Sequence, residues 1–292
     1  MSSVKQKLSI RYALVLIVIL MIVGVCLFWV KIYDNPTKVF YGMLERSLST
    51  SSFSKEIVQP SSSQTKQYVT VETGSSNDAE SVISVDLGPN SIVKTESIGT
   101  PTTDYARYTE VKTPQKNSKG QTANFSSVIG VWGKSSPAGD QVTDGQLFNE
   151  SILTVVPMAN LSIAQRQSLM HFITANDVYQ IVGKPKKIST SGRPQITYNV
   201  NVNTRQFIEM IKQFGEDIGL NQLSSINAGS FSANVSEFHV TVDVISRQLV
   251  SDTQVGTSRR ETFSGYGTQI PISLPTKSIP ITQLESQLQT IQ

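Results

Sequence analysis

The sequence predicts an α+β protein in which an N-terminal transmembrane helix precedes a large curved antiparallel sheet covered by helices. Three observations indicate this fold. An uninterrupted apolar run lies near the N-terminus, short segments of alternating apolar and polar residues follow one another between Gly, Asn and Pro turns, and a few amphipathic segments interrupt this series. Long antiparallel stretches with interposed helices are typical of α+β domains.

The apolar run covers residues 12–30, nineteen positions without a charged side chain. A helix of this length is about 28 Å long, close to the hydrocarbon thickness of a bilayer. Tyr12 begins the run, Trp29 and Tyr33 lie at its other end, and such rings favour the membrane interfaces. The run reaches Val30 without an Ala-x-Ala exit, so we expect a retained signal anchor and not a cleaved signal peptide.

The charges beside the run predict its orientation. Lys5, Lys7 and Arg11 precede it with no acidic residue among them. An excess of Lys and Arg favours the cytoplasmic side, so residues 1–11 are expected in the cytoplasm and the C-terminal domain outside the cell membrane. The membrane is therefore an expected partner through residues 12–30.

The exterior part is formally neutral and lacks cysteine. Once the three cations before the run are set aside, Lys and Arg equal Asp and Glu at 22 each. A neutral domain lacks the basic footprint of nucleic-acid binding, so no nucleic-acid partner is expected. The single cysteine, Cys26, lies inside the run, which excludes disulfides from the exterior domain.

The first half of the exterior reads as a helix and a meander. Asn35-Pro36 is a helix-start signal before an amphipathic segment that reaches Leu48. A Ser-rich stretch, residues 49–66, separates this helix from the expected strands. These strands are Tyr68–Thr73, Ser81–Leu87, Ser91–Ile98 and Tyr105–Lys112, and their short connections favour antiparallel neighbours.

The middle of the chain reads as more helical. Leu161–Ala175 is an expected helix, whereas Leu147–Val156 fits either a helix or a strand. The apolar cluster 128–132 contains Trp132 between glycines. It suits a mobile flap at a cavity mouth or a membrane-touching edge, and equally a segment of core.

The second half contains the clearest patterns. Val178–Ile188 and Ile196–Val202 are expected to pair around a turn at Ser191-Gly192. Thr204 is the expected cap of a helix that stops at Gly219 and carries Phe207, Ile211, Phe214 and Ile218 as one apolar stripe. Strands at 238–245, 247–255 and 261–274 follow, and a short amphipathic segment (Ile281, Leu284, Leu288) ends the chain.

The closing segment Ser264–Pro275, SGYGTQIPISLP, carries a resemblance. Together with the starting helix, the meander and the inserted helices, it resembles the LolA/LolB lipoprotein carriers and the LppX/LprG-like lipid-binding proteins, over roughly residues 37–285. The resemblance implies a half-barrel covered by helices, with an apolar cavity that holds acyl chains. It also implies one domain, 36–285, followed by a tail, 286–292.

The resemblance implies a ligand site without catalytic chemistry. The residues expected to line the cavity are Trp132, Phe207, Ile211 and Phe214, although the helical stripe would equally fill a dry core. The only histidines, His171 and His239, have no metal-ligand neighbours at zinc spacings. No catalytic motif is supported by its partners, so no enzyme activity, cofactor or metal is expected.

Two functions follow as expectations. The first is a membrane-anchored extracytoplasmic protein that binds a lipid or a lipidated partner, such as a lipoprotein. The alternative is a protein–protein interaction, sensor or assembly module that recognises envelope proteins and needs no cavity.

Overall fold

The structure, a computed structural model, describes residues 17–21, 23–25, 35–60, 64–72, 78–86, 91–114, 116, 120–135, 146–231, 234–268 and 271–291. Most of the predicted span, residues 12–30, lies outside these ranges, and its described parts, 17–21 and 23–25, are helical. Among the described residues, no helix combines the length and the apolar character needed to cross a bilayer.

One sheet organises the fold, with the strand order β12-β6-β5-β4-β3-β2-β1-β11-β10-β9-β8-β7. Its strands are β1 (Ser52–Pro60), β2 (Gln64–Glu72), β3 (Asp78–Asp86), β4 (Ile92–Gly99), β5 (Asp104–Lys112), β6 (Gly133–Lys134), β7 (Tyr179–Thr190), β8 (Arg193–Asn203), β9 (Val235–Asp243), β10 (Leu249–Gln254), β11 (Arg260–Ser264) and β12 (Ile279–Pro280). The expected α+β fold with a large antiparallel sheet is confirmed. The described strands do not close into a barrel, because β12 and β7 are opposite edges.

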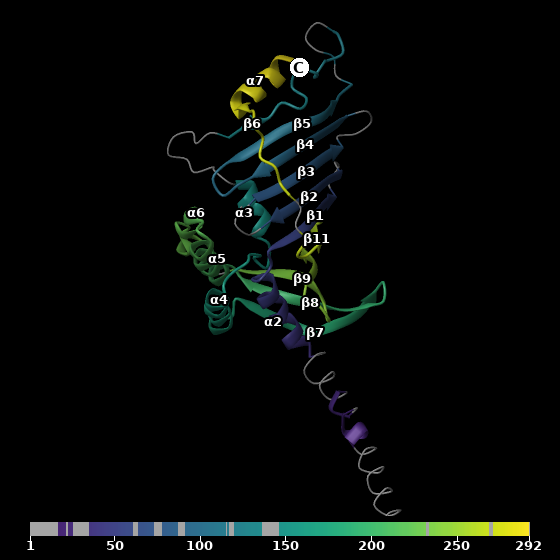
Figure 1. Cartoon of the computed structure of the whole chain (residues 1–292), viewed down its shortest axis with the longest axis vertical. Coiled ribbons are helices and arrows are strands. Elements are labelled where there is room, and N and C mark those ends of the chain that lie inside the picture. The colour runs from purple at the N-terminus through teal and green to yellow at the C-terminus, as the bar shows by residue number, and fades with distance from the viewer. Residues whose placement is uncertain are drawn as a thin grey trace, which may run out of the picture.

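Two meanders meet in the middle of this sheet. Strands β1 to β5 pair in chain order, and so do β7 to β11; the antiparallel pairing of β1 with β11 joins them (Figure 1). Only β12 runs parallel to its neighbour, β6, among the described pairings. The β1–β11 pairing therefore decides that the chain forms one sheet and not two.

In the described ranges, six α-helices accompany the sheet: α2 (Pro36–Ser47), α3 (Gln146–Ile152), α4 (Ile163–Ala175), α5 (Thr204–Ile218), α6 (Asn221–Ser224) and α7 (Ile281–Ile291). Asn35 caps α2 as expected, and Gly219, with φ of 77°, ends α5. The expected cap Thr204 is wrong by one residue. Asn203 is the N-cap, because its Oδ1 accepts a hydrogen bond from the Gln206 amide.

The predicted alternation places the main core on one face of β8 and β9. Ile196, Tyr198, Val200 and Val202 are buried, while Asn199 on the opposite face is exposed. Paired across from them, Val240 and Val242 are buried too. Helices α2, α4 and α5 cover this face, and their apolar side chains complete one cluster with it.

A second, smaller core lies under α7 at the other end of the sheet. Its buried members are Phe125, Val128 and Leu284. Gly133 of β6 allows α7 to approach, since a Cβ there would lie 2.6 Å from Ile281 Cδ1. The boundary expected at residue 285 falls inside this helix.

Two further sequence-based expectations were wrong. The Ser-rich stretch 49–66 contains a strand, β1, whose inward positions include the buried Phe53 and Ile57. The closing strand expected at 261–274 ends at Ser264. Gly265 adopts φ of 63° there, and the turn is fixed by a hydrogen bond from the Gly267 amide to the Ser52 carbonyl oxygen.

The approach of α3 to β4 yields a stability prediction. A Cβ at Gly99 would lie 2.9 Å from both the Leu147 Cβ and the Phe148 backbone nitrogen. We expect Gly99→Ala to lower the free energy of unfolding by about 1–3 kcal/mol, as overpacking does. Chemical denaturation at equilibrium measures the change.

Gly42→Ala is the matched control. Gly42 lies inside α2, where a Cβ meets only the Arg247 side chain at ordinary contact distances. Helix propensity then predicts an increase of up to about 1 kcal/mol. Equal effects of the two substitutions would contradict the close approach of α3.

Candidate functional site

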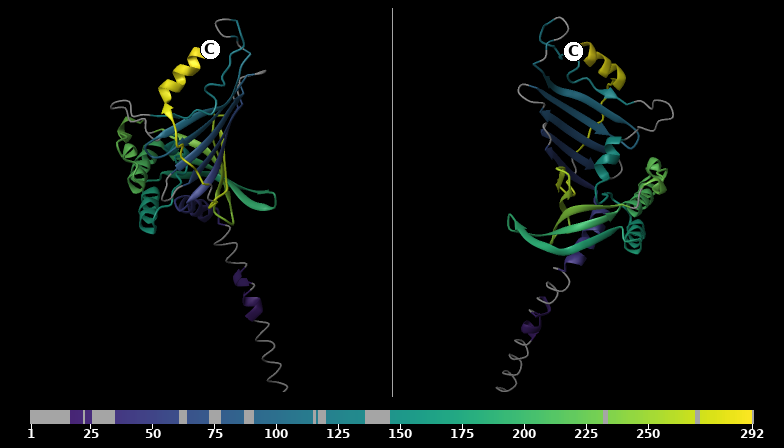
Figure 2. Two further views of the ribbon diagram at one scale, coloured as in Figure 1. Left: turned by 45° about the horizontal axis from the view of Figure 1, so that its top comes forward. Right: turned by 180° about the vertical axis from the view of Figure 1, so that it is seen from behind.

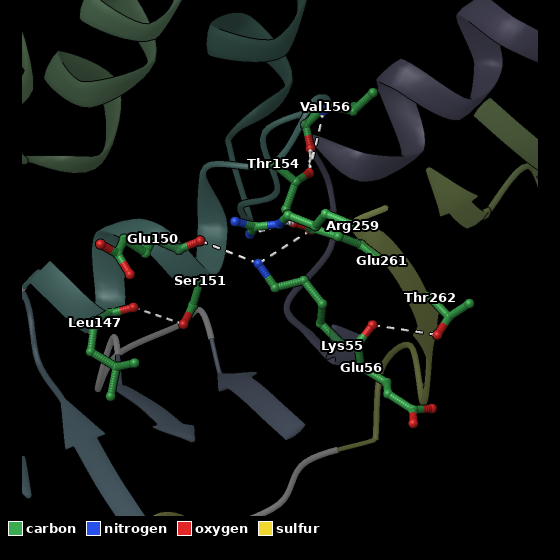
Figure 3. Close-up of polar contacts among 10 residues, drawn as sticks. All are labelled: Lys55, Glu56, Leu147, Glu150, Ser151, Thr154, Val156, Arg259, Glu261 and Thr262. Atoms are coloured by element: carbon green, nitrogen blue, oxygen red, sulfur yellow. Dashed lines mark hydrogen bonds and ion pairs between the residues drawn. The ribbon is translucent and has the colours of Figure 1, made fainter. Parts of the chain in front are cut away.

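A buried charged cluster lies where the two meanders join (Figure 3). Lys55 of β1 is only 2% exposed, and its Nζ donates a hydrogen bond of 3.2 Å to the Glu150 carbonyl oxygen of α3. The same Nζ lies 3.5 Å from Glu261 Oε2 on β11. This ion pair is longer than a strong hydrogen bond, so the ammonium group is solvated chiefly by one carbonyl oxygen and one nearby carboxylate.

Two carboxyl groups, those of Glu261 and Asp252, lie on neighbouring strands on the acidic side of the cluster. Arg259 binds Glu261 Oε1 through two nitrogens, at 2.6 and 3.0 Å. Asp252, directly opposite Glu261 in the sheet register, is buried. Burial, and then the Glu261 carboxylate, raise the pKa of Asp252 to about 8, so Asp252 is protonated at neutral pH. Burial lowers the pKa of Lys55, against the attraction of Glu261.

This cluster fixes the position of α3. The Glu150 carbonyl oxygen is near the C-terminal end of α3, where helix carbonyls lack intrahelical partners and attract cations. At the other end of α3, Asp104 Oδ2 accepts a hydrogen bond of 3.3 Å from the Leu147 amide. The helix is therefore held over the sheet by a cation at one end and an anion at the other.

The second candidate site is a groove beside Trp132. The groove has a volume of about 510 Å³ and is formed by two segments, residues 130–132 and 274–279. Its apolar lining includes Val131, Trp132 and Leu274, and Leu274 is 46% exposed. Lys277 is the charged residue on its lining. This volume falls within the range of ligand pockets in proteins.

The Trp132 ring is held by its neighbours. Gly130 adopts φ of 77° and its amide donates to the Tyr108 carbonyl oxygen, which turns the chain toward β6. The Arg107 guanidinium lies 4.5 Å from the ring centroid, in cation–π contact. Glu96 in turn accepts hydrogen bonds from Arg107 at 2.6 and 3.0 Å. The ring is thus positioned before any ligand arrives, which lowers the entropic cost of binding.

The structure does not bring the four predicted lining residues together. Phe214 and Ile211 are buried in the main core, and Phe207 packs against it with its ring 6.3 Å from Tyr179. Trp132 precedes β6, whereas α5 packs on β8 near the opposite edge of the sheet. Of the four, only Trp132 lines a described groove.

The histidines lie apart from both candidate sites. His171 is exposed on α4, and His239 Nδ1 lies 2.8 Å from Asn199 Oδ1 on the polar face of the sheet. The described residues contain no group of three side chains suited to a metal ion.

Sequence reasoning missed the charged cluster. Lys55 stands in the Ser-rich stretch that was not assigned to a strand, and its burial depends on β11, some two hundred residues later. Phe53, Lys55 and Ile57 alternate with Ser54 and Glu56. This period of two was the available signal, although it gives no indication of the partner strand.

Comparisons with known proteins assign no family. No protein-family model matches the chain, and no curated protein matches it. Among solved structures, it is similar to the crystal structure of the lipoprotein LppX of Mycobacterium tuberculosis, with 9% identity, 82% of this chain and 100% of that chain covered, and a TM-score of 0.37. The predicted likeness to LolA or LolB is not shown.

The raised pKa of Asp252 predicts how stability depends on pH. Between its ordinary value of 3.8 and about 8, folded Asp252 keeps a proton that the unfolded chain has released. The free energy of unfolding should therefore fall as pH rises through this window, by up to about 1.4 kcal/mol per unit. Asp252→Asn should remove this contribution.

Urea denaturation from pH 5 to 8 measures the effect, as the difference between the wild type and Asp252→Asn. Taking the difference reduces the opposite contribution of Lys55, whose lowered pKa adds stability as pH rises toward 10.5. Glu237→Gln, on an exposed position of β9, is the control. Parallel pH profiles for the wild type and Asp252→Asn would contradict a protonated Asp252.

Proposed function

We propose that this chain is a membrane-anchored binding protein that holds an acyl chain of a lipid, or of a lipidated partner, in the Trp132 groove. The groove itself carries the proposal. Its walls combine an apolar part, which includes Trp132 and Leu274, with a polar part that includes Lys277; the Trp132 ring is fixed by Arg107, and Leu274 is 46% exposed. Each methylene buried there would contribute about 0.8 kcal/mol.

The charge at the groove suits an amphiphilic ligand. Lys277 is exposed on the lining, within the same segment as Leu274 and Ile279. An acyl chain against the apolar wall would leave its anionic head group near this ammonium group. The proposed role is binding without catalysis, with the N-terminus in the cytoplasm and the sheet domain outside.

The groove lies at the end of the sheet far from the proposed anchor. Eleven strand spacings separate β12 from β7, about 50 Å along the sheet. Figure 1 shows α7 and β6 at one end of the molecule and α2 with β7 at the other. We infer that the domain presents its ligand away from the membrane that holds it.

A protein–protein role is the second candidate. A rigid tryptophan beside an exposed leucine is also a common anchor for an apolar side chain of a protein partner. Such a partner would be another component of the cell envelope, bound without a lipid.

Photo-crosslinking tests the lipid proposal. We expect a diazirine fatty acid, added to cells that make the full chain, to label peptides containing residues 130–132 and 274–279. Trp132→Ala should reduce the labelling about tenfold, because loss of a central aromatic contact costs 1–2 kcal/mol. Mass spectrometry of the digested protein locates and quantifies the adducts.

Phe231→Ala is the matched control, since Phe231 is another aromatic residue, 39% exposed and outside the groove. It should leave the labelling unchanged. Adducts on α5, near Phe207, would place the ligand between sheet and helices and contradict the groove. If no lipid adduct forms, and a protein is found crosslinked at Trp132, the result would favour the protein–protein role.

The proposed orientation predicts which side a thiol reagent reaches. Ser189 is exposed on β7. Ser189→Cys in a Cys26→Ser background should react with a membrane-impermeant maleimide on intact cells. Reaction only after the cells are permeabilised would contradict the extracytoplasmic assignment.

A further inference from the structure

The β7–β8 hairpin is a basic element without acidic residues. From Val178 to Asn203 the chain contains three lysines and one arginine but no Asp or Glu. Lys184, Lys186 and Lys187 are exposed on β7, and Arg193 begins β8. The exterior domain is formally neutral, so this concentration of cations is local to the hairpin.

The arginine of the hairpin has an acidic partner on the next strand. Asp243 of β9 is 5% exposed and lies 3.0 Å from Arg193 Nε. It also accepts hydrogen bonds from the amides of Ile245 and Ser246 within its own turn. Lys184, Lys186 and Lys187 are exposed, and the hairpin has no acidic residue of its own, so it carries a net positive charge.

Strand β8 of the hairpin contacts the start of α2, where the domain joins its proposed anchor. Tyr198 of β8 donates a hydrogen bond of 2.7 Å to the carbonyl oxygen of Pro36, the first residue of α2. Only residues 31–35 separate Pro36 from the predicted span, a distance of at most about 20 Å when extended. In Figures 1 and 2 the hairpin projects sideways from this end of the molecule.

We propose that the β7–β8 hairpin rests on the surface of the anchoring membrane and binds anionic lipid head groups through Lys184, Lys186 and Lys187. The proposal rests on the membrane anchoring proposed above. Each lysine near an anionic surface contributes enough attraction for about a fivefold shift in binding, or about 100-fold for the three together. With β7 held at the membrane, the Trp132 groove points away from it.

Lysine and proline on an edge strand also hinder pairing with a strand of another chain. Lys184-Pro185 on β7, which pairs only with β8, fits that role too. Protection of the edge strand against pairing needs no lipid. Contact with lipid head groups therefore distinguishes membrane binding from this protective role.

The test uses the full chain in nanodiscs, with a fluorophore on Ser189→Cys in a Cys26→Ser background. Nitroxide on the lipid head group quenches the fluorophore at contact. We expect quenching in nanodiscs with one-third phosphatidylglycerol, weaker quenching in phosphatidylcholine alone, and loss of the difference at 1 M salt. Lys184, Lys186 and Lys187 changed together to Gln should lower the bound-to-free ratio about 100-fold.

The matched control changes Lys112, Lys116 and Lys134 to Gln, which removes the same charge near the opposite edge of the sheet. It should quench like the parent. Equal quenching in both lipid mixtures, or in the β7 variant and the parent, would overturn the proposal. Failure of the chain to incorporate into nanodiscs would instead contradict the anchoring, which is measured separately by co-purification.

Discussion

The pairing of β1 with β11 is the constraint on which the rest of the structure depends. Each meander could form from local hairpins, but only this contact makes them a single sheet. The pairing buries Lys55, and a buried ammonium group is costly unless it is matched. Glu261 and the Glu150 carbonyl oxygen match it. A pairing of β1 with β11 in another register would therefore leave the Lys55 charge uncompensated. The cluster thus favours one register over others.

The β1–β11 pairing, the seam of the sheet, also determines where the Trp132 groove and the basic hairpin lie. Because the meanders extend from it in opposite directions, β6 and α7 come to one end of the sheet, and β7 with α2 to the other. The groove and the basic hairpin are therefore separated by the width of the sheet. The segment between β6 and β7, which contains α3 and α4, crosses the sheet once. Helix α3 is held at the β1–β11 seam.

Two buried aspartates, Asp243 and Asp252, have different roles in this fold. Asp243 is held by its own turn and by Arg193, so it fixes the β9–β10 connection beside the hairpin. Asp252 is protonated, because burial, and then the neighbouring Glu261 carboxylate, raise its pKa. The protonated Asp252 makes the stability contributed by the β10–β11 pairing fall as pH rises toward about 8.

The sequence by itself determined the local elements. Period-two alternation identified β8 and β9 and their buried face, and the Asn-Pro and Gly219 signals fixed the ends of α2 and α5. These features depend on neighbours in the chain, so a single sequence contains them. It also marked Trp132, through an apolar cluster between glycines.

Only the tertiary structure decided which strands meet across long distances. The burial of Lys55 beside Glu261 and the separation of Trp132 from Phe214 depend on contacts between residues far apart in sequence. An apolar helix stripe such as Phe207–Phe214 has the same pattern whether it faces a ligand or a packed core. What lies opposite the stripe is set by the order of strands in the sheet, which no local pattern encodes.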